Sequence, residues 1–202
     1  MSDVDRLRGG WRSTEVIPHQ VFVCGYCDRE VASICGYAFG EHANGTGSII
    51  GGLYICPNCL RPTLFSPNGE QTPMQALGEA IEHVPDELDA LYEEARACTS
   101  HGSNTAAVMC CRKVLMHIAV DKGAQAGLHF AEYVDHLADH HYIPPNGKQW
   151  VDHIRLKGNE ANHEIQLMDT ADAKDLLLFT GMLLRFIYDF PSRIPSPPTT
   201  PP

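Results

Sequence analysis

The sequence predicts two parts of different fold class, a small β module followed by an all-α helical bundle, so that the whole chain is α+β. Apolar residues alternate with a period of about two before residue 66, and recur with a period of about 3.6 after Pro73. The stretch between is rich in Pro, Gly and Asn, which is typical of a linker. The predicted divisions are a frayed N-terminus (1–15), the β module (16–66), a linker (67–73), the helical bundle (74–190) and a disordered Pro-rich tail (191–202).

Four cysteines in two Cys-x-x-Cys motifs indicate a metal site in the first part. The two motifs are separated by 28 residues. Two residues between cysteines let the backbone turn so that both sulfurs reach one ion, at about 2.3 Å each. The pattern is that of a four-thiolate zinc ribbon, and we predict one structural Zn2+ with no open coordination position for catalysis. The predicted ligands are Cys24, Cys27, Cys56 and Cys59.

Two other uses of these cysteines are less consistent with the sequence. A thioredoxin-like redox site needs one Cys-x-x-Cys at a strand-to-helix junction, whereas this chain has two motifs in a Gly-rich, strand-like region. Disulfides suit a secreted protein, and the N-terminus does not resemble a signal peptide. Cys35 is a candidate fifth ligand, but we expect it to be a small hydrophobe buried in a strand.

Charge and hydropathy limit the partners. No apolar run approaches the ~18 residues needed to cross a bilayer, so we expect no membrane association. The eight cysteines, without a signal peptide, predict a reducing cytoplasmic location. The net charge is −10, and residues 73–202 carry ten Lys/Arg against eighteen Asp/Glu. This negative charge disfavours sequence-independent binding to the phosphates of nucleic acid. It does not exclude a local cluster of basic residues that binds one.

Turn and capping signals divide the chain into its expected elements. Strands are expected over 16–24, 31–39, 48–56 and 62–65. Helices are expected over 74–84, from Pro85 to Gly102, from a cap at Ser103 or Asn104 to about Gly123, over 128–140, from Trp150 onward, and from a cap at Thr170 to about Asp189.

Two polar features in the helical part are candidate functional residues. Arg112 interrupts an apolar helix, where a buried arginine is costly unless it is paired; a surface arginine or a structural ion pair is the simpler interpretation. Arg155, Asn159 and His163 are four residues apart and would share one face of a continuous helix. Such a stripe could hold a phosphate or orient His163 as a general base. Spacing alone favours the alternative, a polar helix–loop junction capped by its own side chains.

The order of these features resembles the domain-of-unknown-function (DUF) family 4145. The resemblance rests on a zinc ribbon ending in Cys-Pro-x-Cys, an acidic helix, Ala-x-x-x-Cys-Arg-Lys-Val-Leu at 107–115, Arg-x-x-Gly-Asn-x-x-x-His at 155–163 and a final apolar helix. That family is similar to HEPN-like helical bundles, many of which are ribonucleases in prokaryotic conflict systems. The resemblance implies a bacterial or phage protein associated with restriction or antiphage defence, or with nucleic-acid-linked regulation.

The resemblance departs from HEPN ribonucleases at the catalytic motif. Those enzymes use Arg, a polar residue, three others and then His, and here Gly158 stands at the arginine position. Arg155, about one turn earlier, would have to substitute for it. We therefore expect a non-catalytic zinc-containing adaptor that binds a protein partner or a nucleic-acid end.

The alternative is a metal-independent endoribonuclease. It would use His163 as the base with Asn159, and Arg155 or Arg112 would bind the anionic phosphate. The resemblance also implies that such a site forms in a homodimer through the helical bundle. In either case we expect these four residues to converge in space.

Overall fold

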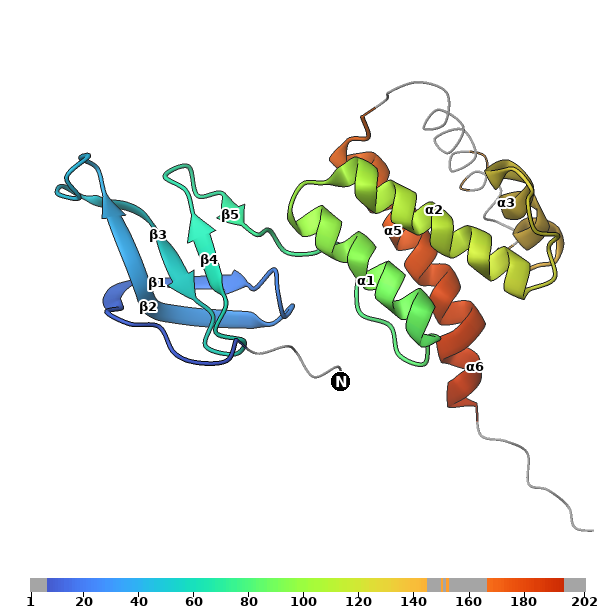
Figure 1. The fold of residues 1–202 in the computed structure, drawn as a ribbon, viewed down its shortest axis with the longest axis horizontal. Coiled ribbons are helices and arrows are strands. Elements are labelled where there is room, and N and C mark those ends of the chain that lie inside the picture. The colour runs from blue at the N-terminus through green and yellow to red at the C-terminus, as the bar shows by residue number, and fades with distance from the viewer. Residues whose placement is uncertain (1–6, 145–149, 151, 153–166, 195–202) are drawn as a thin grey trace, which may run out of the picture. The chain divides into compact units, whose positions relative to one another are not determined.

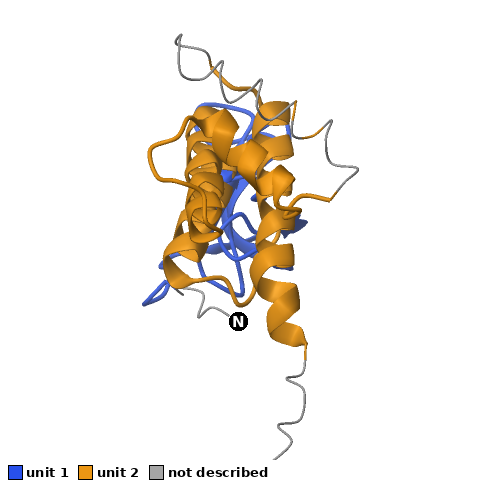
Figure 2. Cartoon of the chain, turned by 90° about the vertical axis from the view of Figure 1, so that its right-hand side faces the viewer, with its two compact units in different colours: residues 1–76, 100–102 blue, residues 77–99, 103–202 orange. Residues whose placement is uncertain are grey.

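The computed structural model describes residues 7–144, 150, 152 and 167–194 of the 202-residue chain (Figure 1). The chain divides into two compact units, residues 1–76 with 100–102 and residues 77–99 with 103–202 (Figure 2). The first is called the β unit below and the second the helical unit, so the predicted α+β class is confirmed. Among the described residues, no helix has the length and hydropathy that a membrane span requires.

The β unit is one antiparallel sheet in which each strand pairs with the next along the chain, in the order β1-β2-β3-β4-β5 (Figure 1). The first four strands agree with the predicted ranges because their β-branched and aromatic residues are bounded by turns. The strands are β1 (Glu15–Val23), β2 (Glu30–Gly40), β3 (Ile49–Ile55), β4 (Pro62–Phe65) and β5 (Gln71–Thr72).

Strand β5 lies inside the segment predicted to be a linker. Leu64 pairs with Thr72, and Phe65 pairs with Gln71. The side-chain amide of Gln71 also donates to the carbonyl oxygen of Val23, at 2.8 Å. The structure therefore differs from the predicted linker at residues 71 and 72, because a strand of two residues is too short to show a period in the sequence.

The segment before β1 is held against the second cysteine motif, in contrast to the predicted fraying of residues 1–15. The indole N–H of Trp11 donates to the carbonyl oxygen of Leu60 at 2.7 Å. The backbone N–H of Leu7 donates to the carbonyl oxygen of Cys59 at 3.1 Å. Residues 7–11 thus form part of the β unit, while residues 1–6 lie outside the described chain.

The β unit has a small aromatic core beside its cysteines. The Phe65 ring makes edge-to-face contacts with Phe22 and Tyr54, with ring centroids 5.3 and 5.6 Å apart. Ile17 is the remaining large apolar side chain buried in this cluster. Cys35, expected to be buried in a strand, is instead exposed on β2. With Ile55, the described part of this unit therefore buries only five large apolar side chains.

The helical unit has a larger core of aliphatic and aromatic side chains. Helix α2 packs between α3 and α5, and its buried face includes Leu115 and Ile118. Gly102 and Gly123 follow α1 and α2 with positive φ values of 71° and 98°, as helix C-terminal glycines do. The helices are α1 (Asp86–Ser100), α2 (Asn104–Asp121), α3 (Phe130–Asp139), α5 (Thr170–Leu184), a π-helical turn η2 (Arg185–Asp189) and α6 (Phe190–Arg193).

The predicted helix over 74–84 is wrong, because this segment is irregular. Gly78 and His83 have positive φ values of 71° and 62°, which an α-helix does not accommodate. Its backbone instead bonds to side chains of α1. Arg96 donates to the carbonyl oxygens of Leu77 and Gly78 at 3.2 and 3.3 Å, and the N–H of Leu77 donates to the Thr99 hydroxyl at 3.0 Å. These bonds replace those that a helix would have made.

Both ends of the last helical stretch also differ from prediction. The N-cap of α5 is Asp169 rather than Thr170, since the Asp169 carboxylate accepts from the N–H of Asp172 at 2.8 Å. At the other end the chain continues as η2 and α6, so residues 191–193 of the predicted disordered tail are helical, while residues 195–202 lie outside the described chain. The helix expected from Trp150 falls mostly on residues outside the described chain. The Trp150 ring itself stacks on Phe179, with centroids 5.9 Å apart.

Candidate metal centre

The two Cys-x-x-Cys motifs fold into turns with the same backbone hydrogen bonds. In the first, the N–H of Asp28 donates to the carbonyl oxygen of Cys24, whose own N–H donates to Arg29. In the second, the N–H of Leu60 donates to the carbonyl oxygen of Cys56, and the N–H of Cys56 donates to the carbonyl oxygen of Arg61. All four distances are 2.9 or 3.0 Å.

Each turn closes through a residue in the left-handed region. Asp28 has a φ of 53° and Leu60 a φ of 61°. This conformation is uncommon for a residue other than glycine and costs energy. It turns the chain back into the next strand, so that both sulfurs of a motif point to the same side of the turn. The two turns lie at the ends of the β1–β2 and β3–β4 hairpins.

The hairpins bring the four predicted ligands together. Their sulfur atoms all lie within 4.8 Å of one another. Across the two turns, the sulfurs of Cys24 and Cys59 are 3.7 Å apart, and those of Cys27 and Cys56 are 3.8 Å apart. A tetrahedral site with metal–sulfur bonds of about 2.3 Å has sulfur–sulfur edges of about 3.8 Å. A disulfide would need about 2.0 Å. The cluster thus has the dimensions of a four-thiolate metal site.

Burial makes this cluster unfavourable for bare thiolates. Cys24, Cys56 and Cys59 are fully buried. Loss of hydration raises the pKa of Cys24 and raises the pKa of Cys59 to about 11, so these thiols keep their protons near neutral pH. For Cys27, burial also acts to raise the pKa, but hydrogen bonds from Asn58 and from backbone outweigh it and lower the pKa. A bound cation would displace the protons, as thiolate ligation requires.

Aromatic and cationic side chains surround the turns. The Arg61 guanidinium carbon lies 5.1 Å from the centroid of the Tyr26 ring, which links the second turn to the first. Trp11 contacts the Tyr37 ring edge-on, with centroids 6.4 Å apart, while its N–H bonds to the second turn. None of these groups offers a further metal ligand. Cys35 is exposed and is not part of the cluster.

Of the four residues of the helical unit that were predicted to converge, the structure describes only Arg112. Arg112 is 5% exposed, and its guanidinium carbon lies 4.4 Å from the centroid of the Phe130 ring. Burial lowers the pKa of its guanidinium. The arginine thus stays inside the unit and packs against an aromatic face. Arg155, Asn159 and His163 lie outside the described residues, so their convergence with Arg112 stays a prediction.

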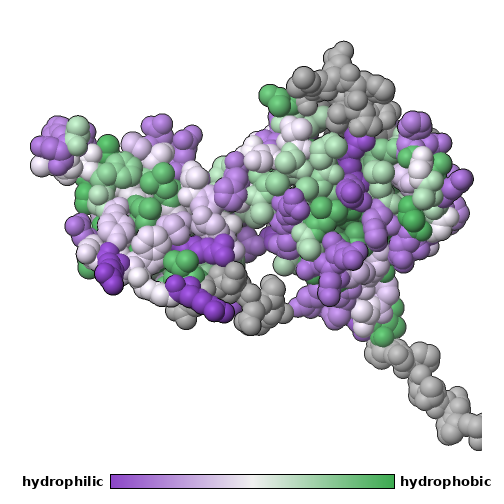
Figure 3. Space-filling model, in the orientation of Figure 1, coloured by the Kyte–Doolittle hydropathy of each residue, from purple (hydrophilic) through white to green (hydrophobic). Residues whose placement is uncertain are grey.

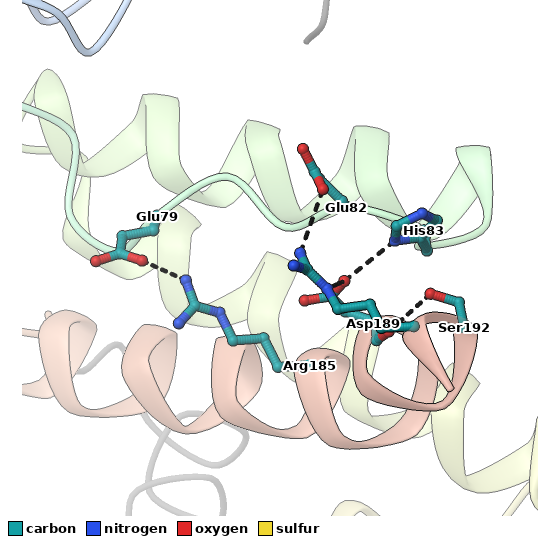
Figure 4. A network of polar contacts seen from close by, with 7 residues as sticks. Glu79, Glu82, His83, Arg185, Asp189 and Ser192 are labelled. Atoms are coloured by element: carbon teal, nitrogen blue, oxygen red, sulfur yellow. Dashed lines mark hydrogen bonds and ion pairs between the residues drawn. The ribbon is translucent and has the colours of Figure 1, made fainter. Parts of the chain in front are cut away.

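A polar network that the sequence did not reveal ties the irregular segment before α1 to the C-terminal end of the last helix (Figure 4). Arg193 contacts Asp189 at 2.7 Å and Glu82 at 3.2 Å. The ring Nδ1 of His83 lies 3.1 Å from the Asp189 carboxylate. Arg193 lowers the pKa of Asp189 through their hydrogen bond, while burial opposes the shift and a hydrogen bond with His83 adds to it. With the arginine bonded to both acids, the network is an ion-pair clamp.

The fold and the cysteine cluster define a two-unit chain with a candidate four-thiolate metal centre. The chain belongs to the family described as Domain of unknown function (DUF4145), whose model matches residues 93–196, just over half of its length. The predicted family is therefore confirmed. The match includes Arg112 and the segment 155–163, whereas the four cysteines lie before it. No curated protein and no solved structure matches the chain.

Proposed function

We propose that this chain is a non-catalytic, zinc-containing adaptor, in which one structural Zn2+ fixes the shape of a β unit that binds a protein partner. The closed geometry of the cysteine cluster carries the proposal. Four sulfurs within 4.8 Å of one another would complete a tetrahedral sphere around the ion. The metal would then have no open position for water or substrate, and its role would be to stabilise the fold.

The surface of the β unit supports a protein as the partner. Its strands expose aliphatic side chains that a small isolated module would be expected to bury. Val16, on the edge strand β1, is 84% exposed. Apolar surface is visible among the polar residues of this unit in Figure 3. The other exposed aliphatic residues of the strands are Val21, Ile34, Ile49, Ile50 and Leu64. The net charge of −10 makes a phosphate backbone a less favourable partner.

A role in restriction or antiphage defence is part of the proposal and is supported by the sequence resemblance. The second candidate function, a metal-independent HEPN-like endoribonuclease, is supported by the motif of Arg155, Asn159 and His163. A cytoplasmic location is proposed for both. They differ in whether His163 is needed for cleavage.

The first test separates the adaptor from the ribonuclease. Purified wild-type protein and the His163→Ala variant are incubated with mixed RNA in the presence of a chelator of free divalent ions. The adaptor predicts the same absence of cleavage in both samples. Cleavage by the wild-type protein that the substitution abolishes would overturn the proposal in favour of the ribonuclease. Elemental analysis of the same preparation should give one zinc ion per chain.

The second test addresses the proposed binding surface. Proteins that co-purify with the wild-type chain from its native cells are compared with those that co-purify with Val16→Asp. Lys113→Asp, at an exposed position in the helical unit, is the control. The adaptor predicts a partner that is lost only with Val16→Asp. The same set of proteins with all three baits would count against the β unit as the binding surface.

A further inference from the structure

A groove of about 330 Å³ on the helical unit has the features of a ligand site, and it is separate from the cysteine cluster. One wall comes from the last helical stretch, α5 with η2 and α6, and the opposite wall from the irregular segment before α1. Ligand pockets in proteins have volumes of about 300–1,000 Å³ and combine apolar walls with a few polar groups. The groove lies at the lower end of that range.

The wall from the last helix is apolar and open to solvent. Leu178, Met182, Phe186 and Phe190 follow one another at intervals of four residues and line the groove. The two phenylalanine rings meet edge-to-face, with centroids 5.4 Å apart, and each side chain is about half exposed. Part of this wall belongs to the π-helical turn, and such turns are frequent at functional sites. The wall offers an aromatic surface to an apolar molecule.

One residue that lines the groove, Tyr92, carries a hydroxyl without a hydrogen bond to the described part of the chain. The residue as a whole is 1% exposed. Its hydroxyl oxygen is not among the fully buried side-chain atoms that lack a partner, so this oxygen reaches the surface of the groove. A polar group in such a position can bond to a ligand and fix its orientation. Burial raises the pKa of Tyr92 to about 12, so the hydroxyl keeps its proton and can donate it in a hydrogen bond.

Two glycines leave the space around this hydroxyl. A Cβ at Gly181 would lie 2.6 Å from the Tyr92 hydroxyl oxygen, and a Cβ at Gly78 would lie 2.8 Å from it. Both distances are too short for any other residue. Both glycines line the groove, one on each wall, so the hydroxyl lies between the two walls. Gly181 is the more informative of the two, because a glycine inside an apolar helix weakens the helix.

The rim of the groove is electrically balanced. Arg185 forms an ion pair with Glu79 across the opening (Figure 4). The Glu79 side chain is 77% exposed and that of Arg185 is 39% exposed. The surrounding sequence, residues 73–202, carries eight more acidic than basic residues. An anionic ligand would have to compete with Glu79 in this negative field, and a cation would meet Arg185, so a neutral ligand is favoured.

We propose that this groove binds a small neutral molecule with an apolar, preferably aromatic, body and a carbonyl oxygen that accepts a hydrogen bond from Tyr92. The aromatic body lies against Phe186 and Phe190, and the carbonyl oxygen reaches between Gly78 and Gly181. This assignment explains the two glycines, the unpaired phenol and the exposed apolar wall together. It does not depend on the metal centre or on the adaptor function.

The test uses two probes of nearly the same shape, acetophenone and ethylbenzene, of which only the first carries a carbonyl oxygen. Binding is followed by NMR of protein labelled with 13C at its methionine methyl groups. Met182 reports from the groove, and Met109, which is exposed on α2, reports non-specific binding. The proposal predicts that both probes shift the Met182 signal and leave that of Met109 unchanged. We define the preference as the ratio of the dissociation constant of ethylbenzene to that of acetophenone. Because one neutral hydrogen bond is at stake, this ratio should be about fivefold higher in the wild-type protein than in the variant Tyr92→Phe.

The substitution Tyr92→Phe removes the hydroxyl and keeps the ring. It should abolish the fivefold preference and leave the affinity for ethylbenzene unchanged. Tyr188→Phe is the matched control, because its hydroxyl donates to Asp121 at 3.0 Å and Tyr188 does not line the groove. That variant should retain the preference. An unchanged Met182 signal with both probes would overturn the site, and a preference that survives Tyr92→Phe would overturn the role of the phenol.

Discussion

Replacing Cys56 by serine should unfold the β unit and leave the helical unit folded. Cys56 is fully buried, and its sulfur is 3.8 Å from that of Cys27. Serine provides a hydroxyl that is a poor metal ligand near neutral pH, so the cluster would lose one of its four metal bonds. Three cysteines of the cluster would remain, and two of them, Cys24 and Cys59, are fully buried, so in a folded unit their thiolates would lack the full charge compensation of a bound ion.

The size of the apolar core sets the expected magnitude. Besides the cysteines, the described part of the β unit buries five large apolar side chains, which are Ile17, Phe22, Tyr54, Ile55 and Phe65. At about 1.5–3 kcal/mol each, their burial contributes roughly 7–15 kcal/mol. A structural Zn2+ contributes ~10 kcal/mol or more in small modules. The metal therefore stabilises the unit about as much as its whole apolar core, and the unit should not remain folded without it.

Trp11 supplies the assay. Its indole N–H bonds to Leu60, which directly follows the last cysteine, so its environment reports on the second turn. The chain has two tryptophans, so in the variant Trp150→Phe all tryptophan fluorescence comes from Trp11. In this background Cys56→Ser should move the Trp11 fluorescence maximum to the red and reduce the bound metal to well below one ion per chain. The helical circular dichroism should persist, since the helical unit has its own core.

Cys35→Ser is the matched control, because Cys35 lies in the same unit but is exposed and outside the cluster. It should retain the metal and the wild-type Trp11 emission. A Cys56→Ser protein with one metal ion per chain and unchanged Trp11 emission would refute the role of the cluster. Equal unfolding of both variants would show that serine substitution, rather than loss of a ligand, is the cause.

Two further substitutions test the helical unit. Arg96→Met should lower the free energy of unfolding by about 3 kcal/mol in chemical denaturation, because it leaves two backbone carbonyl oxygens before α1 without their donor; the exposed Lys113→Met should change it by less than about 0.5 kcal/mol. Asp189→Asn should destabilise the protein at neutral pH, because Arg193 holds the pKa of this carboxylate below its usual value. A lowered folded-state pKa stabilises the protein above the unfolded pKa of about 4 and loses this effect as the pH falls through the folded pKa. The difference from wild type should therefore vanish in acid, and a difference that grows there would contradict the ion-pair clamp.

The cysteine cluster could be predicted from the sequence because its geometry is set locally. Two residues between cysteines determine the turn, and the hydrogen bonds of each turn span only five residues, as between Cys24 and Arg29. The strands were predictable for a similar reason, since their alternation and turn residues lie within the strands themselves. Helix α1 also follows local signals, with acidic residues in its first turn and Gly102 after its end.

The irregular segment before α1 could not be predicted, because distant side chains determine it. Its sequence has some apolar periodicity, but its backbone bonds go to Arg96 and Thr99, about twenty residues away. The groove could not be predicted for the same reason, because residues far apart in the sequence form it. Tyr92 is a core residue of α1, and only the approach of Gly78 and Gly181 to its ring shows that its hydroxyl end faces open space. An interior glycine in an apolar helix was the one local signal.

The π-helical turn at Arg185–Asp189 determines which face of the last helical stretch carries Arg193. A π turn closes hydrogen bonds between residues five apart, so it holds one residue more than an α turn. The wide turn absorbs this extra residue, so deleting it would restore an unbroken α-helix and leave residues 190–193 on the same face. Closing the turn to α geometry without a deletion would instead rotate residues 190–193 by about 100° relative to α5. Arg193 would then turn away from Glu82, while Arg185, at the start of the turn, would keep its partner Glu79. A change in backbone hydrogen bonding alone, with no exchange of side chains, would thus change which residues of α6 meet the opposite wall of the groove.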